Sequence, residues 1–241
     1  MKFLKKNGYN LCFTVIVLVL ALMPVLLLND VVKSTTVLFL GKCISFAIVA
    51  IGLDLIWGHT GILSLGHGLY FCLGAYGMGM YLKLVQTHGQ ITDFMQVGGL
   101  KKLPLIWKPF LSLPGTFLMI FLVPGIVSGL IGYFIFKNRV KGVYFSIISQ
   151  ALTWAAYSIF IAMSPYTNGN VGISQIQSLL GSLRGPKNEG NLIALFYIAL
   201  VVLIVVYAAS TFLIHTKFGK LMIAIRDGEN RTYFSGYCVS N

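Results

Sequence analysis

Six long apolar stretches, separated by more polar segments, set the pattern of the chain. Each is close to the roughly 20 residues that an α-helix needs to cross a bilayer. The pattern predicts an all-α fold, a polytopic bundle of about six transmembrane helices that belongs to a single membrane domain over residues 1–241. The expected spans are residues 11–28, 35–57, 62–84, 116–136, 143–163 and 192–214.

Two of the connecting segments are too long to be simple turns. The segment over residues 85–115 contains three prolines and little helical periodicity, and the segment over residues 164–190 contains five glycines. We expect short interfacial helices within them.

Composition excludes an ordinary soluble domain. The chain is 57% hydrophobic and only 10% charged, which is far from the usual balance of globular proteins. With the apolar stretches assigned to the membrane, no remaining segment is large enough for an ATP site or a catalytic fold. We therefore expect a transporter component and not an enzyme. No catalytic residue and no cofactor is predicted.

The positions of the basic residues indicate how the chain is oriented in the membrane, and they do not indicate a ligand. The formal net charge is +12, which alone suggests nucleic acid. The basic residues, however, lie in short segments beside the spans, notably KFLKK, KNRVK and HTKFGK. Basic segments of this kind mark the cytoplasmic side of a membrane protein. A multi-pass protein with a cytoplasmic N-terminus is therefore predicted.

The stretch over residues 52–83 is apolar enough for a bilayer, yet it carries an acid, two histidines and eight glycines. Lipid disfavours ionisable groups and unsatisfied backbone, so this stretch should face protein or a water-filled route. A polar side also marks the fifth span. Together they give the candidate substrate path: Asp54, His59, Ser64, His67, Gln150 and Thr153.

Each of these features has a structural alternative. Asp54 either lines the path or orders the turn that follows it, and His67 either lines the path or forms a packing hydrogen bond between helices. The motif Gly58-His59-Thr60-Gly61 is either a surface turn between two helices or the break of a discontinuous helix. The two histidines, eight residues apart, suit no common zinc motif, so no metal site is predicted.

The segment over residues 216–241 is predicted to be a cytoplasmic coupling segment. Leu221, Met222 and Ile225 fall on one face of a short helix, with charged residues beside them. Such a helix docks into the groove of a partner or lies on an anionic lipid surface.

Three stretches, in this order, resemble a known family: GLDLIWGHTGILSLGHGLYFCLGAYGMGMYL, KGVYFSIISQALTW and FGKLMIAIRDGENRTYFSGY. They are similar to the permease subunits of bacterial branched-chain amino acid ABC importers (LivM type), and nearest to the urea-transport branch, UrtC. The resemblance covers the chain from about residue 40.

The resemblance implies a function and a set of partners. The chain would be an inner (plasma) membrane permease that pairs with a second similar permease, ABC ATPase subunits and a periplasmic substrate-binding protein. It would import urea, a related small amide or branched-chain amino acids. The residues expected to touch the ATPase are Gly219, Leu221, Met222, Ile225, Arg226, Asp227 and Glu229.

The chain departs from the family pattern in three places. His59 stands where the family usually has Tyr, and NGNVGI over residues 168–173 is a reduced form of a GGNNGL-like loop. The sequence also ends just after the coupling segment, where family members continue, so a C-terminally truncated permease is expected. The alternative function is a passive channel or an ion-coupled carrier that uses Asp54 and His67.

Overall fold

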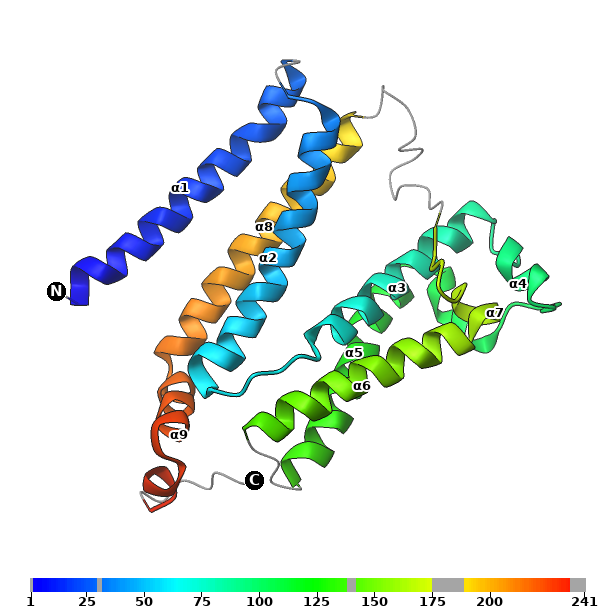
Figure 1. The fold of residues 1–241 in the computed structure, drawn as a ribbon. Coiled ribbons are helices and arrows are strands. Elements are labelled where there is room, and N and C mark those ends of the chain that lie inside the picture. Colours follow the sequence, from blue (N-terminus) through cyan, green and yellow to red (C-terminus); the bar gives the residue numbers. More distant parts are fainter. Residues whose placement is uncertain (1, 30–31, 138–141, 175–188, 235–241) are drawn as a thin grey trace. The chain divides into compact units, whose positions relative to one another are not determined.

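The computed structural model describes residues 2–29, 32–137, 142–174 and 189–234 (Figure 1). Helices account for nearly all of the regular structure in these ranges, and no strand occurs in them, which confirms the all-α prediction. The elements in chain order are α1 (Lys2–Leu28), α2 (Ser34–Thr60), α3 (His67–Gln86), α4 (Asp93–Val97), the 3₁₀ helix η1 (Leu105–Leu111), α5 (Leu113–Lys137), α6 (Val143–Ala162), α7 (Ser164–Thr167), α8 (Glu189–His215) and α9 (Lys217–Phe234).

Five of the described helices are long and apolar enough to cross a membrane, namely α1, α2, α5, α6 and α8. They correspond to five of the six predicted spans. The sixth, predicted from Ile62 to Leu84, corresponds to α3, which starts only at His67 and is not among the five. Its glycines, with His67 and Lys83, lower the hydropathy of this helix.

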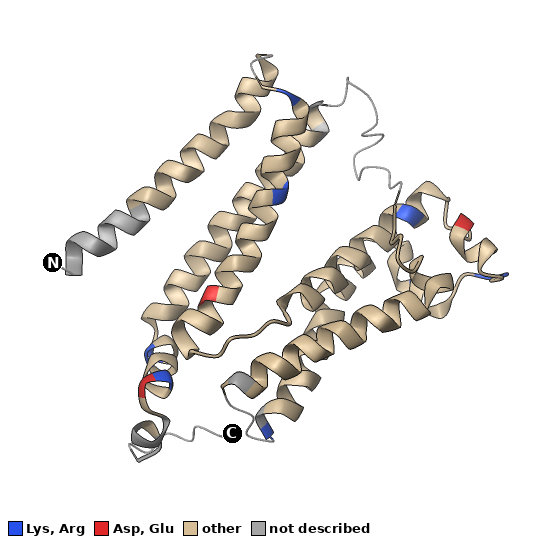
Figure 2. Cartoon of the chain, viewed as in Figure 1, with Lys and Arg blue, Asp and Glu red and all other residues tan. Residues whose placement is uncertain are grey.

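Charged residues lie mainly near the helix ends, and the middle parts of the long helices are almost entirely uncharged (Figure 2). An uncharged middle part is what the hydrocarbon core of a bilayer requires. The charge distribution therefore agrees with the assignment of the long helices as membrane spans.

The chain divides into two compact units. The first, residues 1–52 and 180–218, contains α1, most of α2, and α8. Phe13 stacks on Tyr207 with ring centroids 3.7 Å apart, and the Tyr197 hydroxyl donates to the Ala21 carbonyl at 3.1 Å. The core residues of this unit are Leu27, Val37, Ile44, Phe196, Leu200 and Leu203.

The second unit, residues 53–179 and 219–241, is built on α3, which packs along α5 and η1. A glycine at position 77 lets α5 approach closely, since a Cβ there would lie 3.0 Å from the Ile120 side chain. The core residues of this unit are Met80, Leu84, Met95, Trp107 and Phe110.

The two long connecting segments contain short helices, as expected. The first holds α4 and η1, and the second begins with α7. Trp107 of η1 is fully buried and its indole N–H donates to the Tyr166 carbonyl at 3.2 Å, which fastens α7 to η1. The Tyr76 hydroxyl of α3 donates to the Thr167 carbonyl at 3.5 Å. These elements form a packed platform at one end of α3.

Candidate functional site

The polar stretch after α2 contains a non-helical linker. The predicted turn at Gly58–Gly61 is misplaced, because α2 continues to Thr60 and the non-helical residues are 61–66. We call Gly61–Gly66 the α2–α3 linker. It opens with Gly61 at φ +73°, a left-handed conformation that glycine adopts without strain.

Hydroxyl groups of α6 hold this linker. The Ser146 hydroxyl donates to the Leu63 carbonyl at 2.7 Å, and the Leu65 N–H donates to the Ser149 Oγ at 3.0 Å. The Ser149 hydroxyl in turn donates to the Ser146 carbonyl at 2.9 Å. Backbone outside a helix is tolerated in a membrane protein only where such groups satisfy it or where it lines a cavity.

Several predicted path residues meet at the linker. Ser64 is buried, and its carbonyl lies 3.3 Å from Nδ1 of the half-buried His67. Gly66 lies against α6, where an added Cβ would be 3.8 Å from Oγ1 of Thr153. The linker, His67 and Thr153 thus form one polar cluster with Ser146 and Ser149.

The other predicted path residues lie elsewhere. Gln150 is exposed on α6, and Asp54 is exposed on α2. The Asp54 carboxylate covers Gly58, where an added Cβ would meet its Oδ1 at 2.6 Å. His59 Nδ1 lies 3.4 Å from the Asp54 carbonyl, so these residues interact locally at the end of α2.

Ser146 and Ser149 were not among the predicted path residues. Their signal in the sequence is spacing: residues 146, 149 and 153 recur at three and four positions, which places them on one face of a helix. What the sequence could not reveal is that this face meets a linker more than 80 positions away, at separations of 83 and 84 residues.

Arg226 of α9 binds the end of α2. Its guanidinium NH1 donates to the Gly58 carbonyl at 2.7 Å, and its Nε donates to Asp227 Oδ1 at 3.0 Å. The neighbouring carbonyls of α2 are also satisfied, that of Ile56 by the Thr60 hydroxyl and that of Trp57 by the Gly61 N–H. A cation at a helix C-terminus also interacts favourably with the helix dipole.

Gly61 makes room for this arginine. An added Cβ at Gly61 would lie 2.8 Å from the Cγ of Arg226. The first residue of the α2–α3 linker therefore carries two requirements, a left-handed backbone and the absence of a side chain. Through Arg226, α9 contacts both the last turn of α2 and the start of the linker.

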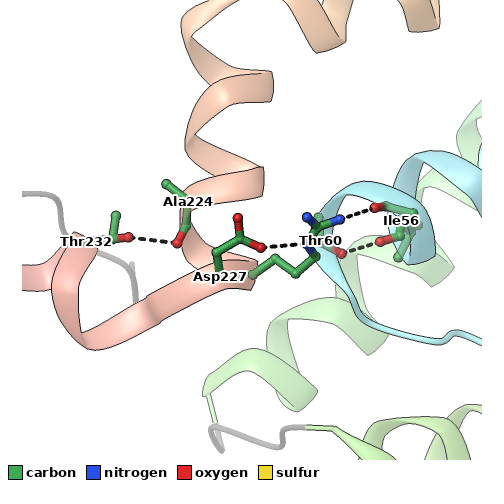
Figure 3. Close-up of polar contacts among 7 residues, drawn as sticks. Ile56, Thr60, Ala224, Asp227 and Thr232 are labelled. Carbon is green, nitrogen blue, oxygen red and sulfur yellow. Dashed lines mark hydrogen bonds and ion pairs between the residues drawn. The ribbon is translucent and has the colours of Figure 1, made fainter. Parts of the chain in front are cut away.

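The remaining predicted coupling residues lie along α9. Gly219 is buried, and Leu221, Met222 and Ile225 are half-buried, whereas Asp227 is exposed. The helix bends at Gly228, whose backbone is extended. The Thr232 hydroxyl donates to the Ala224 carbonyl at 3.1 Å (Figure 3), and it also donates to the Gly228 carbonyl at 3.1 Å. The side chain of Glu229 lies outside the described residues.

The described residues contain no group of three or more His, Cys, Asp or Glu side chains placed to hold a metal ion. The chemistry that the cluster can offer is hydrogen bonding, from hydroxyls, an imidazole and peptide groups.

Comparison with known families decides the class of protein. Residues 35–241 match the family model described as the permease component of the branched-chain amino acid transport system. The chain belongs to this permease family. Comparisons with curated proteins and with solved structures gave no match. The chain is therefore the membrane component of a transport system and a multi-pass membrane protein.

Proposed function

We propose that this permease is the transmembrane subunit of an ATP-driven importer in the bacterial inner membrane, and that its cargo is urea or a related small amide. The family supports an importer permease. The partners would be ABC ATPase subunits, a second homologous permease and a periplasmic substrate-binding protein. The observation that carries the proposal is the contact between Arg226 of α9 and the end of α2, where the polar linker begins.

The α2–α3 linker and the facing side of α6 would form part of the path. Ser64, His67 and Thr153 lie at this cluster, and we keep Asp54, His59 and Gln150, which lie outside it, as further candidate path residues. A small amide has both N–H donors and a carbonyl acceptor. Such a solute would have to bond both to the α6 hydroxyls and to the linker peptide groups that they release, because a buried polar group left unpaired is costly.

The polarity of the cluster favours a neutral cargo. Apart from the imidazole of His67, the cluster consists of hydroxyl and peptide groups, which carry no formal charge, and Arg226 is engaged by Gly58 and Asp227. A zwitterionic amino acid needs partners for an ammonium and a carboxylate, because burying an unpaired charge is costly. A neutral amide needs only hydrogen bonds. Branched-chain amino acids, named in the family description, are the alternative cargo.

The coupling proposal assigns separate roles to the residues of α9. Leu221, Met222 and Ile225 would contact the ATPase, while Gly219, Asp227 and Glu229 shape the segment. Arg226 would then link a displacement of α9 to the end of α2 and so to the linker. This places the mechanical connection inside the permease, at a hydrogen bond that can be altered by substitution.

The test is uptake of labelled urea and labelled leucine by vesicles that contain the assembled complex. We expect ATP-dependent uptake of urea and little uptake of leucine. Uptake of leucine alone would reject the amide proposal and keep the importer. Uptake that needs no ATP but follows an ion gradient would favour a channel or carrier that uses Asp54 and His67.

Ile225→Asp tests the coupling contact in the same vesicles. A carboxylate on the apolar face of α9 should uncouple ATP hydrolysis from uptake, because it places a charge where an apolar contact is proposed. Ile225→Leu preserves an apolar side chain of the same volume class and serves as the matched control. Normal uptake by the aspartate variant would mean that this face does not touch the ATPase.

A further inference from the structure

The outward side of η1 is fixed by the way its other side packs. In a 3₁₀ helix, residues three apart lie above one another. Trp107 and Phe110 form the inward row, with 0% and 7% of their surface exposed. The row of Leu105, Lys108 and Leu111 consequently faces outward, and Leu105 and Leu111 are 78% and 50% exposed. The buried tryptophan prevents η1 from rolling to hide this row.

The position of η1 along the chain places it at a membrane surface. It ends at Leu111, and the apolar span of α5 begins at Leu113 and runs for 23 residues. At 1.5 Å per residue such a helix is about 35 Å long, which matches the roughly 30 Å of hydrocarbon in a bilayer. Its ends, and therefore η1, must lie close to the lipid headgroups.

This end of the second unit is basic. Lys101, Lys102 and Lys108 are exposed, and none of them forms an ion pair within the described residues. Asp93 is the only acidic residue in segments 87–112 and 163–174, all of which the structure describes. Three ammonium groups therefore lie beside exposed aliphatic side chains at the level of the headgroups.

We propose that this surface binds anionic phospholipid. We call it the η1 surface, made of Lys101, Lys102, Leu105, Ile106, Lys108 and Leu111. The aliphatic side chains would enter the boundary between headgroups and acyl chains, and the lysines would contact headgroup phosphates. Because Trp107 ties η1 to α3 and α7, bound lipid would also fix the platform against the bilayer. The proposal does not depend on the cargo or on ATP coupling.

The experiment is lipid retention by the purified chain, measured by native mass spectrometry during titration with phosphatidylglycerol or phosphatidylcholine. We expect selective retention of phosphatidylglycerol. Each lysine near an anionic surface contributes about fivefold to affinity at low ionic strength. The variant with Lys101→Gln, Lys102→Gln and Lys108→Gln should therefore lose roughly a hundredfold, and added salt should shrink that difference.

Two further variants separate the contribution of the lysine charges from that of the aliphatic side chains. Replacing the same three lysines with arginine keeps the charge and should retain binding. Leu105→Ser with Ile106→Ser keeps the charge but removes the apolar part, and should weaken retention of both lipids. Equal retention of phosphatidylglycerol by the glutamine and native chains would overturn the proposal. If the glutamine variant instead lost only binding to the purified substrate-binding protein, the η1 surface would be a protein docking site and the lipid proposal would be wrong.

Discussion

Gly61 is required for two reasons, its backbone conformation and its lack of a side chain, and the two can be separated by experiment. Its backbone is left-handed at φ +73°, and its missing side chain leaves space for the Arg226 stem. Alanine would pay about 1–2 kcal/mol for the backbone conformation and would also push Arg226 away from the Gly58 carbonyl. The second effect disappears if the arginine is absent.

We therefore expect Gly61→Ala to reduce stability less in an Arg226→Ala background than in the native chain. The difference, about 0.5–3 kcal/mol for groups in direct contact, is measured by denaturant unfolding of the purified chain in detergent. Gly99→Ala is the matched control, because Gly99 has φ +81° and nothing within 4 Å of an added Cβ. The change in stability caused by Gly99→Ala should simply add to the change caused by Arg226→Ala. Additive behaviour at Gly61 would mean that the arginine does not hold the linker.

Removal of the Ser149 hydroxyl should leave one specific backbone group of the linker unpaired. Ser149→Ala removes the acceptor of the part-buried Leu65 N–H. An unsatisfied donor costs about 1–3 kcal/mol when it is fully buried, so we expect a loss near the lower end of that range. Ser158→Ala on the same helix removes only a local bond to the Trp154 carbonyl and should change stability by less than about 0.5 kcal/mol. Thermal unfolding of both variants compares them. Equal effects would show that α6 does not hold the linker through Ser149.

At the scale of elements, α3 presents glycines of two kinds. Gly77 is buried, and an added Cβ would lie 3.0 Å from Ile120 and 3.3 Å from Phe110. Gly68 has nothing within 4 Å of an added Cβ. One glycine therefore permits close packing between α3, α5 and η1, whereas the other only adds conformational freedom to the unfolded chain.

Alanine substitutions should have opposite signs at these two positions. Gly77→Ala overfills a packed contact and should destabilise by about 1–3 kcal/mol. Gly68→Ala should stabilise by roughly 0.5–1 kcal/mol, since alanine is the better helix former. Chemical unfolding of each variant provides the comparison. A neutral Gly77→Ala would mean that α3 and α5 are not closely packed at this level.

Hydropathy located five spans to within a few residues, because lipid solvation acts on every residue of a span and leaves a long, redundant signal. The linker had no such signal. Glycines at 58 and 61 suit several positions for a turn, and the choice depends on partners far along the chain, Ser146, Ser149 and Arg226. Likewise, Arg226 was predicted from the sequence as a coupling residue, but the hydrogen bond from its guanidinium to the Gly58 carbonyl could not be predicted.

At the scale of the whole molecule, the Arg226 contact constrains how many times the chain crosses the membrane. α1 and α2 are consecutive spans, so the start of α1 and the end of α2 lie on one side. Arg226 binds the end of α2, which puts α9 on that side as well. An even number of crossings must then separate Thr60 from Lys217. α5, α6 and α8 supply three, so we expect α3, which at 20 residues is about 30 Å long, to supply the fourth.

This crossing count predicts that positions 90 and 220 lie on opposite sides of the membrane. From the basic segments we expect the N-terminus and α9 in the cytoplasm, so a cysteine at Gln90 should react with an impermeant maleimide in intact cells. Cysteines at Lys5 and Lys220 should react only after permeabilisation. All three cysteines are introduced, one at a time, into a chain whose native cysteines are replaced by serine. Labelling of positions 90 and 220 from the same side would show that α3 does not cross, and the α2–α3 linker would then join helices that do not form a transmembrane hairpin. Labelling of 5 and 220 in intact cells, with 90 protected, would keep the six crossings and invert the orientation.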